Sequence, residues 1–413
     1  MQVKFILSVL SAVMAFGVAQ QAIAEIAPVY AVTGLGALPG DTSSIAYGIN
    51  EAGVIVGSSS DAGGSNTIAG FKWQAGVMTD LGLYTGHTAI RPWDVNASGN
   101  VTGRATGGAG GSNYGVYHDG AGWQLAGWVG GTRGNGFGIN DSNQMVGNMR
   151  LPSGDYSRAF VWSPVGGTVQ LPTIHPDDPG NAVPAYGGFE GGSYATGINA
   201  SGVVVGSSGI SDTHGSDRGF KWTTSGGMTN LGTPASQGLA GLADFTQSYA
   251  QNLNDTGLIV GAADRGSGLT RAVYWDTNDV IHDIGTLGGN SGWAYAVNDD
   301  NVIVGFSNNG SGNRGFVFMP GGTITDLNTL LASSASGWVI TRAYDLNNRG
   351  LIVGEGTFNG VTQAVVLTPV PEPATLPLLA AAGVVALRGI RRSRLRLGRC
   401  VSHLKATKSD PSG

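Results

Sequence analysis

Apolar and polar residues alternate along most of this chain, in short stretches that recur at a regular spacing. The stretch from Ala46 to Gly57 joins an alternating segment, a polar turn and a continuous apolar run, and six further versions follow it. Alternation is typical of a half-buried β-strand, and a short branched apolar run suits a buried strand. Each version is centred on an asparagine, with gaps of 46, 44, 59, 55, 44 and 49 residues between Asn50, Asn96, Asn140, Asn199, Asn254, Asn298 and Asn347. A spacing of about 40 to 50 residues indicates a solenoid, a propeller or an array.

Each repeat is predicted to hold four short strands. In the first repeat a strand ends at Asn50 and a turn runs to Gly53, where asparagine and glycine suit the first and fourth positions of a type I turn. The second strand is the apolar run that ends at Gly57, and the third carries Phe71 and Trp73. A last strand at residues 78–82 completes the pattern of a propeller blade.

Paired aromatic residues recur in the third strands of later repeats. Side chains two residues apart lie on one face of a strand, as Phe71 and Trp73 do. We expect these pairs to fill the wedge between neighbouring sheets, and stacking on a ligand is the alternative.

The two ends of the array predict a closed ring. The seventh repeat stops near Leu367 after three strands, whereas residues 30–38 form a strand-like stretch with no strands before it. If that stretch completes the seventh sheet, no strand edge stays open. The predicted fold is therefore all-β, a seven-bladed β-propeller over residues 26–368 closed by the N-terminal strand. An open β-solenoid is the alternative.

Composition supports a folded, acidic body. The 413 residues include 71 glycines and 12% charged residues, while nine Trp, twelve Tyr and twelve Phe recur in register with branched residues, unlike a disordered segment. Residues 26–368 hold 13 Lys and Arg against 24 Asp and Glu, which argues against general affinity for nucleic acid. The one cysteine, Cys400, leaves the body no internal disulfide.

Residues 1–24 have the pattern of a secretory signal peptide. Lys4 precedes an apolar run, and the small residues Ala22 and Ala24 form a cleavage site for signal peptidase. The run lacks the polar face of a first core helix, which is the alternative. We therefore expect an exported protein.

Three segments follow one another at the C-terminal end. Pro371, Glu372 and Pro373 precede an apolar run at residues 376–387, and five arginines follow between residues 388 and 396. Twelve residues at about 1.5 Å each make about 18 Å of helix, less than the ~30 Å hydrocarbon core, although flanking residues extend the reach. Basic residues after the run would keep a tail at 397–413 cytoplasmic and the repeats outside.

This end resembles the PEP-CTERM sorting signal of Gram-negative bacteria over residues 370–396. The resemblance implies that an exosortase-type membrane peptidase recognises Pro371, Glu372 and Pro373 and that the protein reaches the cell envelope or extracellular matrix. The apolar helix would then lie in the inner membrane only before processing. An ordinary C-terminal membrane anchor is the alternative.

The repeats resemble the HAF family of exported bacterial proteins, which is named for a His-Ala-Phe sequence at the third strand. The resemblance covers nearly all of residues 30–367. Arginine takes the place of the naming histidine, at Arg158, Arg218, Arg271 and Arg314.

Catalytic motifs are scarce in this sequence. Hydrolases need placed nucleophiles or paired carboxylates, yet the chain has five glutamates, and its six histidines form no metal-spaced pair. Most aspartates fall in turns or in the recurring Thr-Asp-Leu sequence, where a structural role explains them. A propeller can still bring distant carboxylates together, so a glycan-active enzyme with a carboxylate pair at the central opening is the alternative function.

The gap of 59 residues contains the most distinctive loop, between residues 172 and 190. Long loops on rigid scaffolds often carry function, and Asp177, Asp178 and Glu190 are candidate calcium ligands. A solvated surface loop is the alternative. No other cofactor is expected.

These patterns predict an exported, non-catalytic propeller with a structural or adhesive role in the envelope or an exopolysaccharide matrix. The expected partners are signal peptidase, an exosortase-type peptidase and exopolysaccharide. The repeated stretch is interpreted as scaffold, so local function is expected where the repeat is interrupted.

Overall fold

The computed structural model describes residues 28–61, 68–127, 133–150, 157–174, 192–209, 217–265 and 269–370. Residues 29–369 form one compact unit. The predicted signal peptide, the candidate calcium ligands and the sorting signal lie outside the described residues, so those predictions stay predictions. Within the described ranges, no helix is long and apolar enough to cross a membrane.

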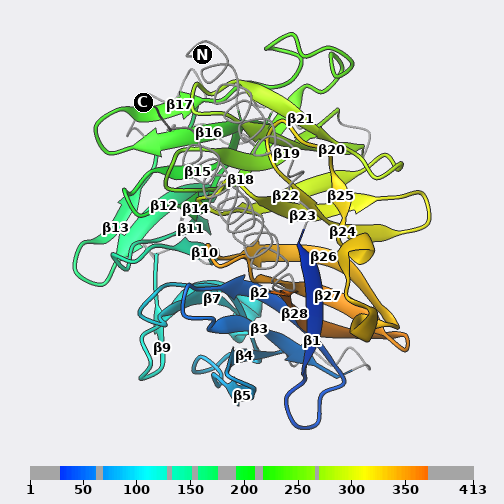
Figure 1. The fold of residues 1–413 in the computed structure, drawn as a ribbon. Coiled ribbons are helices and arrows are strands. Elements are labelled where there is room, and N and C mark those ends of the chain that lie inside the picture. The colour runs from blue at the N-terminus through cyan, green and yellow to red at the C-terminus, as the bar shows by residue number, and fades with distance from the viewer. Residues whose placement is uncertain are drawn as a thin grey trace, which may run out of the picture. The chain divides into compact units, whose positions relative to one another are not determined.

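Seven antiparallel sheets of four strands each are arranged in a ring, which makes the compact unit a seven-bladed β-propeller (Figure 1). This confirms the predicted fold class and the four-stranded repeat. The helical content of the described chain is three short 3-10 turns, η1 (Ala109–Gly111), η2 (Leu327–Leu330) and η3 (Ser333–Ala335).

The strands of each blade follow one another in the chain, with the innermost strand first. Blade 1 contains β2 (Ser43–Ile49), β3 (Ile55–Ser60), β4 (Ala69–Gln74) and β5 (Val77–Asp80). Blade 2 contains β6 (Ala89–Val95), β7 (Val101–Thr106), β8 (Tyr114–His118) and β9 (Trp123–Leu125). Blade 3 contains β10 (Gly134–Ile139), β11 (Met145–Arg150), β12 (Ser157–Ser163) and β13 (Gly167–Gln170).

Blades 4 to 6 repeat this order. Blade 4 contains β14 (Ser193–Ile198), β15 (Val204–Gly209), β16 (Asp217–Thr223) and β17 (Gly227–Asn230). Blade 5 contains β18 (Gln247–Leu253), β19 (Ile259–Asp264), β20 (Thr270–Trp275) and β21 (Ile281–Gly285). Blade 6 contains β22 (Gly292–Val297), β23 (Ile303–Asn308), β24 (Asn313–Phe318) and β25 (Thr325–Asp326).

The last blade takes strands from both ends of the chain. It contains β26 (Trp338–Leu346), β27 (Ile352–Phe358), β28 (Val361–Val370) and, beside β28, β1 (Val29–Gly36) (Figure 1). Tyr30 in β1 is 3% exposed, and its carbonyl accepts a hydrogen bond of 2.8 Å from the Ala332 amide. The prediction that the N-terminal strand completes the seventh sheet is confirmed.

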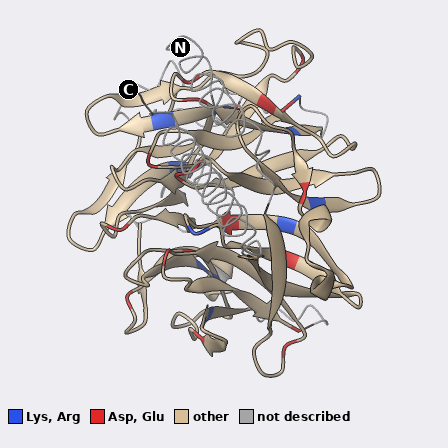
Figure 2. Ribbon diagram, viewed as in Figure 1, with Lys and Arg blue, Asp and Glu red and all other residues tan. Residues whose placement is uncertain are grey.

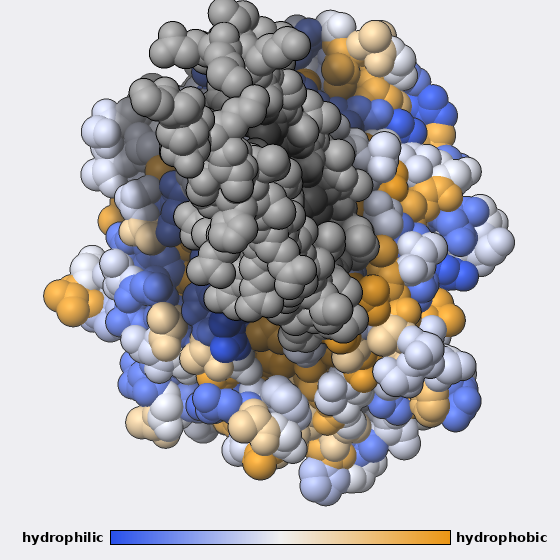
Figure 3. Space-filling model, in the orientation of Figure 1, coloured by the Kyte–Doolittle hydropathy of each residue, from blue (hydrophilic) through white to orange (hydrophobic). Residues whose placement is uncertain are grey.

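Aromatic residues of the third strands fill the space between blades, as predicted. Phe71 of blade 1 is fully buried and packs with Val353 and Ala364 of blade 7. Phe220 of blade 4 likewise packs against Val146 of blade 3. On the face shown in Figure 3, hydrophobic and hydrophilic residues intermix over the described part of the surface.

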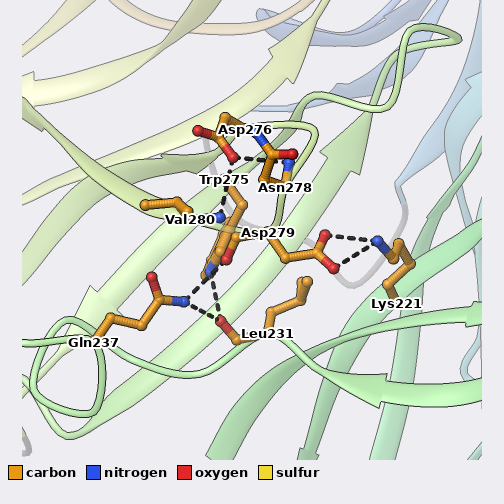
Figure 4. Close-up of polar contacts among 8 residues, drawn as sticks. All are labelled: Lys221, Leu231, Gln237, Trp275, Asp276, Asn278, Asp279 and Val280. Carbon is orange, nitrogen blue, oxygen red and sulfur yellow. Dashed lines mark hydrogen bonds and ion pairs between the residues drawn. The ribbon is translucent and has the colours of Figure 1, made fainter.

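Polar contacts add to this packing between blades 4 and 5 (Figure 4). The Lys221 ammonium contacts both carboxylate oxygens of Asp279, at 2.6 and 2.7 Å. Gln237 donates to the carbonyls of Leu231 at 3.0 Å and of Asp279 at 2.9 Å. The buried Trp275 indole donates to the Leu231 carbonyl at 3.0 Å. These groups have structural partners, so we assign them to the scaffold.

The repeated asparagines join all seven blades in a ring of hydrogen bonds. The side-chain Nδ2 of each donates to the main-chain carbonyl of the asparagine in the next blade, at 2.8 to 3.2 Å. The last bond runs from Asn347 to the carbonyl of Asn50 and closes the ring. The Oδ1 atom of each asparagine accepts from the amide four residues later, as at Val54. One side chain therefore closes a turn and links two blades.

Candidate functional site: the central cavity

Every innermost strand carries a β-bulge three residues before its ring asparagine. The pairing register with the second strand skips one residue there in each blade. A bulge leaves its extra residue unpaired and re-aims the side chain. The skipped residues are Tyr47, Trp93, Phe137, Thr196, Gln251, Tyr295 and Tyr344, and all seven line one cavity.

A glycine on the second strand leaves room for each bulge. A Cβ atom on Gly57 would clash with the Ile45 carbonyl oxygen and with the ring of Phe71. The equivalent glycines of the other blades face the corresponding carbonyl equally closely, namely Gly103, Gly147, Gly206, Gly261, Gly305 and Gly354. The glycine that ends each apolar run is thus required by a close approach of two backbones.

The cavity at the centre of the ring has a volume of about 200 Å³ and receives side chains from all seven blades. At about 30 Å³ for each water molecule, this volume corresponds to roughly seven waters. Each of the seven bulge residues is partly exposed, so its side chain reaches this space.

Five of the seven bulge residues are aromatic, and they come from five consecutive blades. The ring centroids lie 5.0 Å apart for Tyr295 and Tyr344, 5.3 Å for Tyr344 and Tyr47, 4.7 Å for Tyr47 and Trp93, and 6.2 Å for Trp93 and Phe137. These spacings are those of interacting aromatic pairs. We call this set of five residues the aromatic arc. Thr196 and Gln251 give the remaining side of the cavity a polar lining.

Two carboxyl groups also line the cavity, and both link neighbouring blades. Asp94 accepts from the amides of Val95 at 2.7 Å and of Ile139 in the next blade at 2.9 Å. Asp345 accepts from the amides of Leu346 at 2.9 Å and of Ile49 at 2.8 Å. Burial raises the pKa of Asp94 to about 6, and burial together with the charge of Asp94 raises the pKa of Asp345 well above its usual range.

The tyrosines of the arc keep their protons at neutral pH. Burial is the main cause that raises the pKa of Tyr295 to about 12, and it also raises the pKa of Tyr47 and Tyr344. Neutral hydroxyls both donate and accept hydrogen bonds. The indole Nε1 of Trp93 is buried and has no hydrogen-bond partner among the described residues, which leaves a donor beside the cavity.

These cavity residues were not singled out from the sequence, although they lie within the repeated stretch. In blades 1, 3 and 6 their signal is a bulky residue between two small ones, as in Ala46, Tyr47 and Gly48, and the other blades lack it. Simple alternation does not reveal it, because the bulge changes which way the side chain points. In the described part of the chain, no group of three or more His, Cys, Asp or Glu residues could hold a metal ion. The candidate calcium ligands Asp177, Asp178 and Glu190 are outside that part.

Comparison with known proteins reveals similarity of fold. No family model matches the chain, and no curated protein matches it. Among solved structures it is similar to the extracellular domain of a proposed hybrid two-component system from B. thetaiotaomicron (8% identity, TM-score 0.48). That match covers 84% of this chain and 40% of the other. It is also similar to a mutant of puromycin hydrolase (12% identity, TM-score 0.49; 82% and 54% covered) and to TolB from Acinetobacter baumannii (13%, 0.41; 71% and 63%).

Proposed function

We propose that this propeller is an exported, non-catalytic protein of the cell envelope or extracellular polysaccharide matrix, and that its central cavity binds a sugar unit of a polysaccharide. The observation that carries the proposal is the aromatic arc, five adjacent aromatic side chains around one cavity of about 200 Å³. Export and sorting are supported by the sequence patterns at both ends of the chain.

The chemistry of the cavity suits a carbohydrate. A sugar ring presents C–H groups on its faces and hydroxyls at its edge, so it needs apolar flat surfaces together with a few polar groups. Trp93 and the tyrosines supply the flat surfaces. Thr196, Gln251 and the tyrosine hydroxyls supply donors and acceptors.

A second candidate function is cleavage of the bound glycan. Asp94 and Asp345 both line the cavity, and a carboxyl group with a raised pKa is the usual general acid of a glycosidase. Against this role, each of the two carboxyl groups already accepts two main-chain amide hydrogen bonds. We therefore assign both to the support of the cavity.

Calorimetric titration of the purified chain with oligosaccharides tests the binding role. Trp93→Ala and Tyr344→Ala should each weaken binding by about tenfold, because each removes a stacking surface. Phe358→Ala is the matched control, since Phe358 stacks on Trp338 with centroids 5.1 Å apart and does not line the cavity.

Two results would overturn the proposal. If neither neutral nor acidic oligosaccharides bind, the cavity is not a glycan site. If the cavity variants bind as tightly as the unchanged protein, the site lies elsewhere. Release of reducing ends from a glycan, abolished by Asp94→Asn, would establish the enzyme instead.

A further inference from the structure

A second pocket, of about 400 Å³, lies between blades 2, 3 and 4 and is rich in arginine. Arg104, Arg133 and Arg150 line it, together with the polar residues Asn113, Asn135, Asn148, Ser157 and Tyr194. The predicted body, residues 26–368, has 13 basic residues and a net negative charge, so three arginines at one pocket is a local concentration. Figure 2 shows that basic residues are few and scattered on the described part of the ring. We call this the arginine pocket.

Like charges face each other at its inner edge. Arg91 of β6 lies directly opposite Arg104 of β7 in the strand register. Like charges at opposed positions destabilise a sheet. In blade 7 the corresponding pair is Arg342 and Glu355, which form an ion pair. Among the described residues, no carboxylate pairs with Arg91, Arg104 or Arg133, so blade 2 lacks the compensation that blade 7 has.

The guanidinium of Arg104 has hydrogen-bonding capacity left over. Its Nε atom is buried and has no hydrogen-bond partner in the described ranges, and its Nη1 atom makes one long contact, 3.4 Å, to Asn135 Oδ1. Burial and the charge of Arg91 lower the pKa of Arg104, which reports the same uncompensated environment. A buried donor of this kind can bind an acceptor from outside the protein, either a water molecule or an anionic group of a ligand.

The arginine pocket is close to the central cavity. Asn135 of the arginine pocket precedes the cavity residue Phe137 by two positions on β10, a separation of about 7 Å along a strand. Both Arg91 and Arg104 act electrostatically on the cavity residue Tyr47 and lower its pKa against the larger effect of burial. One ligand can therefore place a sugar in the central cavity and a charged group in the arginine pocket.

We propose that the arginine pocket binds an anionic substituent, a carboxylate or a sulfate, of an acidic polysaccharide whose sugar unit enters the central cavity. Planar guanidinium groups suit both anions because they donate paired hydrogen bonds. The inference deepens the proposed function and rests on it, since it names the class of glycan.

The test compares three probes on the purified full chain by calorimetry: tetragalacturonate, a sulfated carrageenan tetrasaccharide and neutral cellotetraose. At least one acidic probe should bind about tenfold more tightly than the neutral one at low salt, and 0.5 M NaCl should remove most of the difference. Comparison of the two acidic probes shows whether the preferred anion is carboxylate or sulfate.

The variant is the double substitution Arg104→Gln with Arg133→Gln, and the control is Arg314→Gln with Arg349→Gln, which removes the same charge outside the pocket. The pocket variant should lose the acidic preference and keep neutral binding, while the control keeps both. Arg104→Gln alone should raise the Tm, because it relieves repulsion from Arg91.

Loss of preference without loss of neutral binding supports the inference. Equal binding of all three probes by the unchanged protein overturns the inference and leaves the proposed function standing. The same holds if the preference for acidic probes survives in the pocket variant, or if it falls equally in the control variant. A lower Tm for Arg104→Gln would make that arginine structural and also overturn the inference. If none of the probes binds, both proposals fail.

Discussion

Asp94 links two blades by a hydrogen bond, although burial disfavours the charged form of its side chain. Its two amide hydrogen bonds hold the carboxyl in place, yet burial raises its pKa to about 6 from its ordinary value of 3.8. The folded protein therefore binds this proton more tightly than the unfolded chain does. The stability associated with the proton is present at low pH and is lost as the pH rises through about 6.

This difference gives a measurable pH dependence. As the pH rises from about 4.5 to 7, deprotonation of Asp94 should lower the free energy of unfolding by about 2 kcal/mol. Deprotonation of Asp345 acts in the same direction. Urea unfolding at both pH values should show a smaller fall for Asp94→Asn than for the unchanged protein. Identical pH dependence in the two proteins would mean that Asp94 is not buried in the way described.

Each bulge also requires a glycine on the neighbouring second strand. Gly206→Ala should destabilise the protein by about 3 kcal/mol, because its Cβ would meet the Tyr194 carbonyl and the Phe220 ring. Gly122 has open space around its Cβ direction, so Gly122→Ala should change stability by less than about 0.5 kcal/mol. Equal Tm values for the two variants would contradict the close approach of the strands.

The sequence predicted the glycine and the asparagine as turn and strand-end residues, and the turn bonds confirm that interpretation at Asn50 and Gly53. It did not predict what the same residues do between blades. A side chain that reaches the next repeat leaves no trace in the local pattern, because the partner is a main-chain carbonyl that any residue could provide.

At the scale of the element, the innermost strand does two jobs within five residues. In β2 the bulge presents Tyr47 to the cavity, and the strand ends at Ile49, directly before Asn50, which donates a hydrogen bond to blade 2. A rigid strand places a binding side chain more accurately than a loop does. The cavity is therefore built on the scaffold. The bulge residue differs between blades, while the asparagine turn that follows it is the same in all seven.

The asparagine ring should contribute measurably to stability. Asn254→Ala removes bonds to the Leu258 amide, the Asn298 carbonyl and the Asn301 side chain, and we expect a loss of about 2 to 3 kcal/mol. Asn278 is an exposed turn residue, and Asn278→Ala should have little effect. Chemical denaturation of both variants checks this, and similar midpoints would refute a structural ring.

For the molecule as a whole, ring closure depends on one strand from the other end of the chain. Sequence reasoning reached this closure correctly, because the seventh repeat lacks a fourth strand and residues 30–38 supply one. The position of the cavity could not be predicted from the sequence, because the distance of a residue from the ring axis depends on how the seven sheets pack together.

Closure gives a prediction that concerns the entire propeller. Tyr30→Ala should lower the stability of the whole ring by about 3 kcal/mol in a single cooperative transition, because Tyr30 is buried against blade 7. Val29→Ala, at an adjacent residue that is 44% exposed, is the control. Scanning calorimetry that shows an unchanged main transition for Tyr30→Ala would contradict closure by β1.

A crystal structure of the protein soaked with an oligosaccharide that binds in calorimetry tests the central claim most directly. We predict electron density for a sugar ring in the central cavity, packed against at least one residue of the aromatic arc. For an acidic oligosaccharide, the anionic group should point to Arg104. Density for the sugar at any other surface, with the central cavity holding only water, would contradict the account.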